Sequence, residues 1–254
     1  MLQECRHRGI LDYLVRKKHV SVNELANKFD VSPVTIRSDL KLLAQQNLLI
    51  RTHGGASVIE DNWFNEETSY DLRTKEHHLE KKEIALKAFK LIDNNDCILI
   101  DASSTCFELA KLIQKSTLNL TVVTNGILTA ELLKDNHNIT TILIGGIIKG
   151  RSNAIESTLG VGLLNNINCN KLFVSAKAFN LEDGLSEFNL YEVELKKIMI
   201  THVQKLFALM DVTKLEKQSL LTFANCESID ALVTNESIPK AIKEKYIKHG
   251  VNII

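Results

Sequence analysis

The chain lacks any apolar run long enough to cross a bilayer. It has 254 residues, of which 44% are hydrophobic and 24% charged, ordinary proportions for a globular protein. Its longest apolar run, residues 142–148, contains two glycines, whereas a membrane-spanning helix needs roughly 20 apolar residues. Charged side chains are spread through residues 1–20. We therefore expect no membrane segment, no signal peptide and a cytoplasmic location.

The chain also lacks the cysteine spacing of a metal site or a disulfide framework. Its five cysteines are widely separated, and no Cys-x-x-Cys pair or Cys/His cluster occurs. Free thiols in a reducing compartment are the better interpretation. We expect no metal and no cofactor.

The chain has no excess of charge of either sign, since 31 lysines and arginines balance 31 acids. Neutrality argues against indiscriminate binding to nucleic acid. The charges are unevenly distributed, however: residues 1–57 hold nine basic and five acidic side chains, and the remainder is acidic by the same margin of four. This asymmetry indicates a small basic module joined to a mildly acidic part.

The basic module begins with two predicted helices. Apolar residues at helical spacing predict a first helix over residues 4–17. A second helix begins at Ser21, because Ser21 and Glu24 have the spacing of a capping box, in which the hydroxyl and the carboxylate satisfy free N–H groups. The predicted inward-facing residues of the two helices are Ile10, Leu11, Leu14, Leu25, Ala26 and Phe29.

A third helix follows a short turn and carries the side chains that suit DNA recognition. Ser32 is a good N-cap, and Pro33 suits the first helical position, where its missing N–H is not needed. Ile36, Leu40 and Leu43 repeat at helical spacing and should face inward. Hydroxyls and one arginine are then left on the outer side near the N-terminus, a mixture that suits phosphates and base edges.

Two β-prone runs then flank His53-Gly54-Gly55, which predicts a hairpin, or wing, over residues 48–59. A plain helical packing module with a solvated basic face is the alternative. The ordered succession of capping box, Ser-Pro cap, arginine-bearing helix and Gly-Gly wing favours DNA binding instead. The candidate DNA contacts are Ser32, Pro33, Val34, Thr35, Arg37, Ser38, Arg51 and His53.

The module resembles the winged helix-turn-helix of DeoR-family transcriptional regulators. The resemblance rests on the pattern Val31-Ser32-x-x-Thr35-Ile36-Arg37-x-Asp39-Leu40 followed by Arg51-x-His53-Gly54-Gly55-Ala56. We expect a DNA-binding domain over residues 1–58 with the helix-turn-helix at about 20–39, a linker over 59–79 and a second domain over 80–254.

The second part alternates apolar strands with helices. A helix over about 81–92 should open it, and further helices should cover about 105–114, 127–133 and 239–248. The predicted strands cover residues 97–101, 120–124, 141–144, 171–175, 205–210 and 231–234. This alternation predicts an α/β domain with a mainly parallel sheet.

Polar loops follow most of these strands, where ligands of parallel sheets gather. Alone, each loop is better explained as a helix cap, a turn or a solvated charge. Together, hydroxyls, backbone amides and lysines suit a phosphate, and Asp and Asn suit sugar hydroxyls. The candidate effector-binding residues are Asp101, Ser103, Ser104, Thr105, Thr124, Asn125, Gly145, Gly146, Lys177, Asp211 and Lys214.

This second part resembles the C-terminal sensor domain of the same family, which is related in fold to ribose phosphate isomerases. The matching pieces include Asp101-x-x-Ser104-Thr105, Gly184-Leu185-Ser186 and Asp211-x-x-Lys214, together with Arg73 and Glu80-Lys81. The resemblance implies a regulator, most simply a repressor of a carbohydrate operon, that binds double-stranded operator DNA and responds to a phosphorylated sugar. Paired half-sites imply a homodimer or homotetramer.

The rival interpretation is a phosphosugar isomerase-like enzyme with Asp101, Lys177 or Lys214 as acid–base groups. Isomerisation needs a carboxylate base above the substrate C–H bond and a partner that stabilises the enediolate. The sequence offers no convincing pair of that kind, and a DNA-binding module would have no use in such an enzyme. We therefore expect a protein that is not an enzyme.

Overall fold

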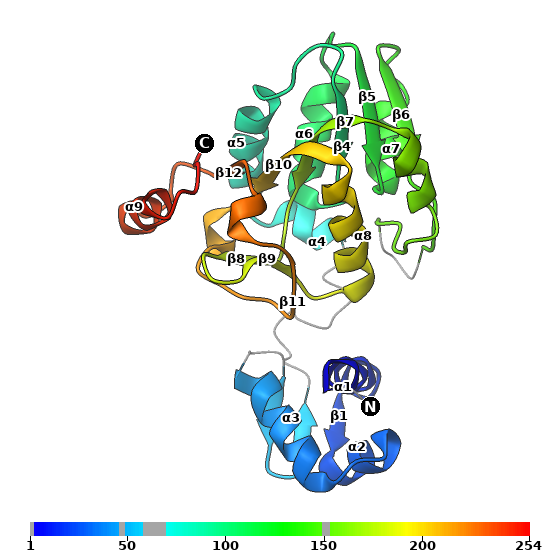
Figure 1. Ribbon diagram of the computed structural model, residues 1–254, viewed down its shortest axis with the longest axis vertical. Helices are drawn as coiled ribbons and strands as arrows, with labels where there is room; N and C mark the ends of the chain where they lie inside the picture. Colours follow the sequence, from blue (N-terminus) through cyan, green and yellow to red (C-terminus); the bar gives the residue numbers. More distant parts are fainter. Residues whose placement is uncertain (1–2, 46–48, 58–69, 149–152) are drawn as a thin grey trace. The chain divides into compact units, whose positions relative to one another are not determined.

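Two units make up the chain in the computed structural model, which describes residues 3–45, 49–57, 70–148 and 153–254 (Figure 1). The unit Met1–Thr68 is called the head, and the unit Ser69–Ile254 is called the body. None of the helices in these described ranges is long and apolar enough to cross a membrane.

The head consists of three helices and a small antiparallel sheet. The helices are α1 (Gln3–Lys17), α2 (Val22–Phe29) and α3 (Pro33–Gln45). The strands are β1 (His19–Ser21), β2 (Ile50–Thr52) and β3 (Gly55–Ser57), and β3 lies between the other two. The predicted winged helix-turn-helix is thus confirmed. The short strand β1 is an addition that depends on its pairing with β3.

Local capping sets the ends of the two central helices of the head. The Ser21 hydroxyl accepts a hydrogen bond from the Glu24 N–H at 3.1 Å, as predicted. The carboxylate of Glu24 accepts a hydrogen bond from the Tyr13 hydroxyl at 2.8 Å, which ties α2 to α1. The Ser32 hydroxyl accepts from the Thr35 N–H at 3.1 Å and caps α3. These caps are local hydrogen bonds that fix the residues at which α2 and α3 begin.

A parallel six-stranded sheet forms the centre of the body, in the order β12-β10-β7-β4-β5-β6. Its strands are β4 (Cys97–Ile100), β5 (Leu120–Thr124), β6 (Ile139–Leu143), β7 (Cys169–Val174), β10 (Val203–Leu209) and β12 (Ala231–Val233). All six were predicted within a few residues, because each is rich in apolar residues, as expected for a parallel sheet that is covered on both faces.

Helices cover the first face of this sheet. They are α5 (His78–Phe89), α6 (Ser104–Gln114) and α7 (Ile127–Leu133). Side chains alternate along each strand, so Ile98 and Ile100 of β4 pack with Ile84 of α5 and Leu109 of α6 on this face. All four side chains are fully buried.

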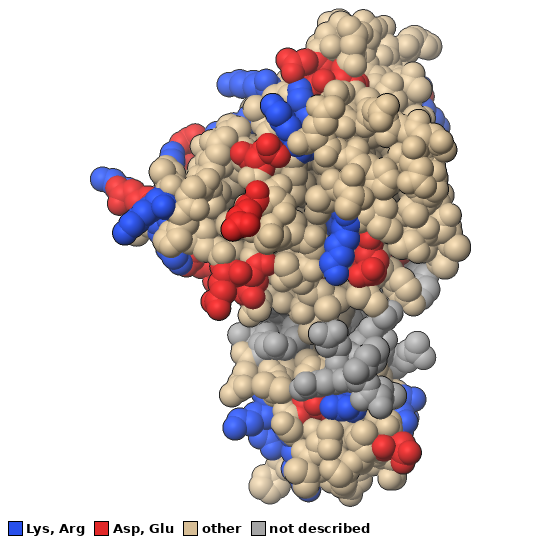
Figure 2. All heavy atoms as spheres, in the orientation of Figure 1, with Lys and Arg blue, Asp and Glu red and all other residues tan. Residues whose placement is uncertain are grey.

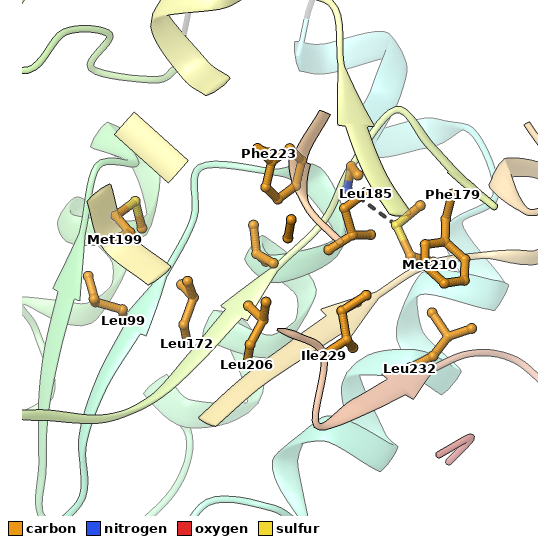
Figure 3. Packing of buried hydrophobic residues seen from close by; sticks show 14 of the residues in the cluster. Leu99, Leu172, Phe179, Leu185, Met199, Leu206, Met210, Phe223, Ile229 and Leu232 are labelled. Atoms are coloured by element: carbon orange, nitrogen blue, oxygen red, sulfur yellow. Dashed lines mark hydrogen bonds between the residues drawn. The ribbon is translucent and has the colours of Figure 1, made fainter. Parts of the chain in front are cut away.

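The second face carries α8 (Leu190–Thr201) and a small antiparallel sheet in the order β11-β9-β8. The small strands are β8 (Ala178–Asn180), β9 (Gly184–Glu187) and β11 (Leu221–Ala224), and α9 (Lys240–Lys248) closes the fold. In Figure 3, Leu99 and Leu172 of the main sheet lie near Met199, and Leu185 lies near Phe223. The sequence analysis did not predict α8 or the small sheet.

The predicted linker over 59–79 needs a correction in its described part. Residues 70–79 contain α4 (Tyr70–Lys75), and α5 begins at His78 rather than at residue 81. The body therefore begins earlier than predicted. Polar composition suggested a connection here, but Tyr70 is buried, so this segment is packed.

Cysteines distant in the sequence meet in one place. Cys97 and Cys169 lie on the neighbouring strands β4 and β7, with their Sγ atoms 3.6 Å apart. Burial raises the pKa of both thiols. The four cysteines whose side chains the structure describes are all free thiols.

Candidate functional site

The first turns of α3 present the predicted DNA contacts to solvent. Val34 is 71% exposed, and Ser32, Pro33, Arg37 and Ser38 are exposed as well. Thr35 is half-buried, with its hydroxyl 2.9 Å from that of Ser32. This surface combines hydroxyls, one methyl-bearing side chain and one guanidinium at a helix N-terminus, as base and phosphate contacts require.

The wing brings two more of the predicted residues to the same place. Arg37 of α3 lines one hollow together with Arg51, Thr52 and His53 of the wing. Asn23, in the first turn of α2, lines it too and was not predicted. Figure 2 shows basic side chains on the head, which agrees with its excess of positive charge. A hollow with two guanidinium groups suits a phosphate backbone.

The wing is attached closely to α2. The Val22 N–H donates to the carbonyl of Gly54 at 2.9 Å. A Cβ at Gly55 would lie 1.9 Å from the Val20 carbonyl oxygen, so only glycine permits this approach of β3 to β1. Gly54 and Gly55 therefore place Arg51 and His53 relative to the helices.

A buried ion pair fixes α3 against α1. Asp39 is 1% exposed and accepts two hydrogen bonds from the Arg6 guanidinium, at 2.6 Å and 3.1 Å. Its carboxylate also lies 2.8 Å from His7 Nε2. Burial alone would raise the pKa of Asp39, but the hydrogen bonds to Arg6 and His7 outweigh burial and lower it. Asp39 thus positions the helix that carries Arg37.

The strand order of the body creates a switch point between β4 and β7. From β4 the chain adds β5 and β6 on one side and then returns to add β7, β10 and β12 on the other. The loops that leave neighbouring strands at such a point diverge and leave a crevice in which ligands bind. Here those loops begin at Asp101 and Ser175.

Asp101 joins the two loops. Its carboxylate accepts hydrogen bonds from the N–H groups of Ser103 and Ser175, both at 3.1 Å. It also forms an ion pair with Lys196 at 3.3 Å. Asp101 is only 1% exposed. Its oxygens are therefore engaged in holding the loops in place.

The N-terminus of α6 lies directly after Asp101. The Ser103 hydroxyl accepts from the Cys106 N–H at 3.2 Å and caps the helix. Ser104 is buried, and Thr105 is fully buried, with no hydrogen-bond partner for its Oγ1 among the residues that the structure describes. A buried hydroxyl without a partner is costly. Its position beside a helix N-terminus suits an anionic group.

Thr124 and Asn125 connect the loops after β4 and β5. The Thr124 hydroxyl accepts from the Gly126 N–H at 3.0 Å. The Asn125 side chain accepts from the Ala102 N–H at 3.0 Å and donates to the Ile155 carbonyl at 3.2 Å. Both residues are buried. In this structure they brace the loops, although sequence analysis singled them out as ligand contacts.

Gly145 and Gly146 follow β6, and Gly146 permits close packing of the segment after residue 152, whereas a Cβ at Gly145 would meet nothing within 4 Å. A Cβ at Gly146 would lie 2.6 Å from the Ser157 hydroxyl, and a Cβ at Gly160 would lie 2.1 Å from the Gly145 carbonyl. Gly146 also has φ +157°, a conformation that other residues rarely adopt. Both the space and the backbone conformation therefore require glycine at this position.

Asp211 and Lys214 lie after β10. Asp211 is 1% exposed; its Oδ1 accepts from the Thr213 N–H at 3.0 Å, and its Oδ2 has no hydrogen-bond partner within the described ranges. Burial would raise the pKa of Asp211, but the charge of Lys214 and the Thr213 hydrogen bond outweigh burial and lower it. The Lys214 ammonium donates to the Ser175 hydroxyl at 3.1 Å. This contact joins the β10 loop to the switch point.

Lys81 of α5 is a further cation near these groups. It is 4% exposed, and burial and the charge of Lys214 lower the pKa of its ammonium to about 8. Sequence analysis noted Lys81 only through the family resemblance. Lys177 follows β7 with an exposed side chain, and its N–H donates to the Ser186 carbonyl at 3.1 Å.

Lys196 of α8 is the largest omission from the sequence analysis. It is 2% exposed, donates to the Ser175 carbonyl at 2.8 Å and pairs with Glu192 at 2.7 Å and Glu187 at 3.6 Å. Burial opposes its charge, but the neighbouring carboxylates outweigh burial and raise its pKa. The only sequence signal was an i, i+4 pair of Glu192 and Lys196, a spacing typical of solvated helix surfaces.

We call Asp101, Ser103–Thr105, Ser175, Asp211, Lys214 and Lys81 the strand-end site. The contacts between Asp101, Ser175 and Lys214 join three of its loops directly. Thr124, Asn125, Gly145 and Gly146 border it through the loops after β5 and β6. The arrangement offers two ammonium groups, a helix N-terminus and two buried oxygens that have no hydrogen-bond partner among the described residues. These groups suit an anion that carries hydroxyl groups.

Comparisons with known proteins agree with both units. Residues 6–62 match the DeoR-like helix-turn-helix domain, and residues 76–236 match the DeoR C terminal sensor domain. The HTH-type transcriptional regulator GolR of Listeria innocua is 39% identical over 248 residues, which cover 98% of this chain and 96% of that protein. The glycerol-3-phosphate regulon repressor of Escherichia coli is 27% identical over 253 residues, which cover 100% of this chain and 99% of that protein.

Among solved structures, ribose 5 phosphate isomerase A from Neisseria gonorrhoeae has a TM-score of 0.41 and 18% identity. The match covers 54% of this chain and 53% of that chain. An overlap of this extent says nothing about activity. The two domain matches and the similarity to GolR over nearly the whole chain are decisive: this chain belongs to the DeoR family of transcriptional regulators.

Proposed function

We propose that this protein represses an operon of carbohydrate metabolism and that a phosphorylated sugar or a related metabolite releases it from operator DNA. The observation that carries the proposal is the strand-end site, in which Lys81 and Lys214 accompany two buried oxygens without partners in the described structure, on Thr105 and Asp211. The names of the relatives support the same proposal, since one is a regulon repressor named for glycerol 3-phosphate.

On DNA, α3 enters the major groove and the wing contacts the backbone. Arg37 and Ser38 are proposed to reach base edges or phosphates, Ser32 and Thr35 to bind phosphates, and Pro33 and Val34 to pack against the groove. Arg51 and His53 are proposed phosphate contacts of the wing, and Asn23 joins them because it lines the same hollow. Paired half-sites call for a homodimer or a homotetramer.

In the body, the phosphate group of the effector is proposed to bind at the N-terminus of α6, to Ser103, Ser104 and Thr105, with Lys81 and Lys214 as counter-charges. Asp211 accepts a hydrogen bond from a sugar hydroxyl through its Oδ2. Lys177 approaches from the β7 turn. Asp101, Thr124, Asn125, Gly145 and Gly146 shape the site by holding the loops, and regulation requires that the effector favour one state of the protein.

The isomerase-like alternative would need a free carboxylate as base. Asp101 is engaged by two N–H groups and by Lys196, so it cannot readily take a proton from carbon. Asp211 keeps one oxygen without a partner in the described structure and is where such a base would lie. Turnover of ribose 5-phosphate by the purified protein, lost in Asp211→Asn, would favour the enzyme.

Two variants test the proposal on operator DNA selected from a random pool. Arg37→Ala should lose specific binding in a gel shift, whereas Lys41→Ala, one turn along the exposed side of α3, should retain it. Lys214→Ala should bind operator normally but need a higher effector concentration for release, by about 100-fold for a difference of about 2.7 kcal/mol.

The effector for that experiment is the compound, from a panel of sugar phosphates, that gives the largest thermal stabilisation. Lys217→Ala, an exposed lysine three residues further on, is the matched control for Lys214. Release of Lys214→Ala at the wild-type concentration would contradict the proposed site. Unchanged operator binding by Arg37→Ala would contradict the proposed recognition helix.

A further inference from the structure

The short helix α4 (Tyr70–Lys75) is the first element of the body after the head in the chain. A helix of six residues has almost no stability of its own, because nucleation is unfavourable and few internal hydrogen bonds form. Contacts with the rest of the body must therefore hold it. Two such contacts stand out, one at each end of the helix.

Lys81 holds the C-terminal end. Its ammonium donates hydrogen bonds to the carbonyl oxygens of Arg73 and Glu76, the latter at 2.8 Å. The last carbonyls of a helix have no partners within the helix. A buried ammonium that satisfies two carbonyls in and just after α4 is consequently a strong cap.

The same ammonium belongs to the strand-end site. The helix that bears it is fixed against the loop after β12 by a hydrogen bond of 2.6 Å from the Glu236 N–H to Glu83. That loop is adjacent to the one that carries Asp211, since β12 and β10 are paired. The charges of Lys214 and Asp211 both act on Lys81. One ammonium thus caps α4 and lies close enough to Lys214 and Asp211 of the strand-end site to feel their charges.

Tyr70 holds the N-terminal end. Its ring packs edge-on against Phe107 in the second turn of α6, with centroids 5.9 Å apart and an interplanar angle of 74°. Tyr70 is 6% exposed, and its hydroxyl has no hydrogen-bond partner in the part of the chain that the structure describes. Both ends of α4 therefore rest on elements that form the strand-end site.

We propose that α4 and the effector anion compete for Lys81, so that a bound anion draws the ammonium away from the carbonyls of Arg73 and Glu76 and releases the end of α4. The inference rests on the proposed effector site and names its means of regulation. A phosphate oxygen attracts an ammonium more strongly than a neutral carbonyl does. By linkage, any state of the protein that fixes α4 binds the effector more weakly.

Hydrogen–deuterium exchange on the full chain tests the competition, with inorganic phosphate as the probe against chloride at equal ionic strength and pH 7. We expect amides 104–107 to exchange more slowly in phosphate and amides 71–77 to exchange faster, by about tenfold, as for loss of one hydrogen bond. Protection at 104–107 with unchanged exchange at 71–77 would overturn the competition and leave the site standing. No protection at 104–107 would overturn the site and, with it, the competition.

A variant at Lys81 tests whether its ammonium holds the end of α4, independently of phosphate binding. Lys81→Met removes the ammonium and keeps an unbranched side chain of similar length. Without phosphate, it should already show the fast exchange at 71–77, and phosphate should add nothing. Lys82→Met, an exposed neighbour on the same helix, should behave as the wild type. Slow exchange at 71–77 in Lys81→Met would mean that Lys81 does not hold α4.

Discussion

Single residues carry much of the positioning in this protein, and Asp39 is the clearest case. Its carboxylate is buried, and its partners Arg6 and His7 come from another helix, more than thirty positions away in the chain. The recognition pattern contains Asp39, but nothing local in the sequence names its partners. The exposure of the proposed DNA contacts was predictable because helical spacing separates inner from outer positions. Long-range ion pairs lack such a signal.

Asp39→Asn should destabilise the head by about 3 kcal/mol at pH 7, because Arg6 is then left buried without its counter-charge. The folded-state pKa of Asp39 lies below its unfolded value of 3.8. Its stabilisation is therefore present above that value and is lost as pH falls through the lower, folded-state pKa. The difference between wild type and variant should shrink in that acidic window, as urea unfolding at several pH values would measure.

Asp30→Asn is the matched control for this prediction. Asp30 is exposed and has φ 52°, a conformation that asparagine also tolerates. Its substitution should change the free energy of unfolding little at any of these pH values. A difference between Asp39→Asn and wild type that stays constant down to acidic pH would show that the ion pair does not titrate as argued.

At the scale of elements, strands of the main sheet were predictable and the second face was not. Each main strand is rich in apolar residues, whereas β8, β9 and β11 are three or four residues long and form only by pairing with one another. Helix α8 was missed because Lys196 occupies its inner side with Val193 and Met199. A lysine among buried positions breaks the apolar periodicity that identifies a helix.

Lys196→Met should destabilise the body by about 3 kcal/mol, because the buried carboxylate of Asp101 and the half-buried carboxylate of Glu187 lose their shared cation. The unfolding transition of the body should shift in calorimetry, while that of the head should not. Lys197→Met changes the next residue, whose ion pair with Glu194 is exposed, and should have almost no effect. Equal behaviour of the two variants would show that the cluster around Lys196 contributes no net stability.

At the scale of the whole molecule, neutrality conceals two oppositely charged parts. The basic excess lies within residues 1–57 and the acidic excess in the remainder. This distribution was readable from the sequence. The strand-end site was readable only in part, because polar loops after parallel strands predict a site, whereas Lys81 and Lys196 reach it from helices. Residues of that kind are found only when the packing of the helices is known.

The charge asymmetry predicts where the salt dependence of operator binding arises. The logarithm of the binding constant K falls linearly with log[salt], and each phosphate contact that is lost should make this negative slope shallower by about 0.9. Arg51→Ala should therefore make the slope shallower by about that amount and weaken binding to all sequences alike, because Arg51 is a proposed contact of the DNA backbone. Fluorescence anisotropy with labelled operator at several salt concentrations measures the slope directly.

Arg37→Ala should differ from Arg51→Ala in kind, since α3 is the proposed reader of base edges. It should also reduce the preference for operator over unrelated DNA. Lys217→Ala, which removes a charge from the body, should leave both slope and preference unchanged. If Lys217→Ala lowered the slope as much as Arg51→Ala, the body itself would contact DNA. The head would then not be the only surface that reads the operator, and the effector would act on DNA contacts in both units.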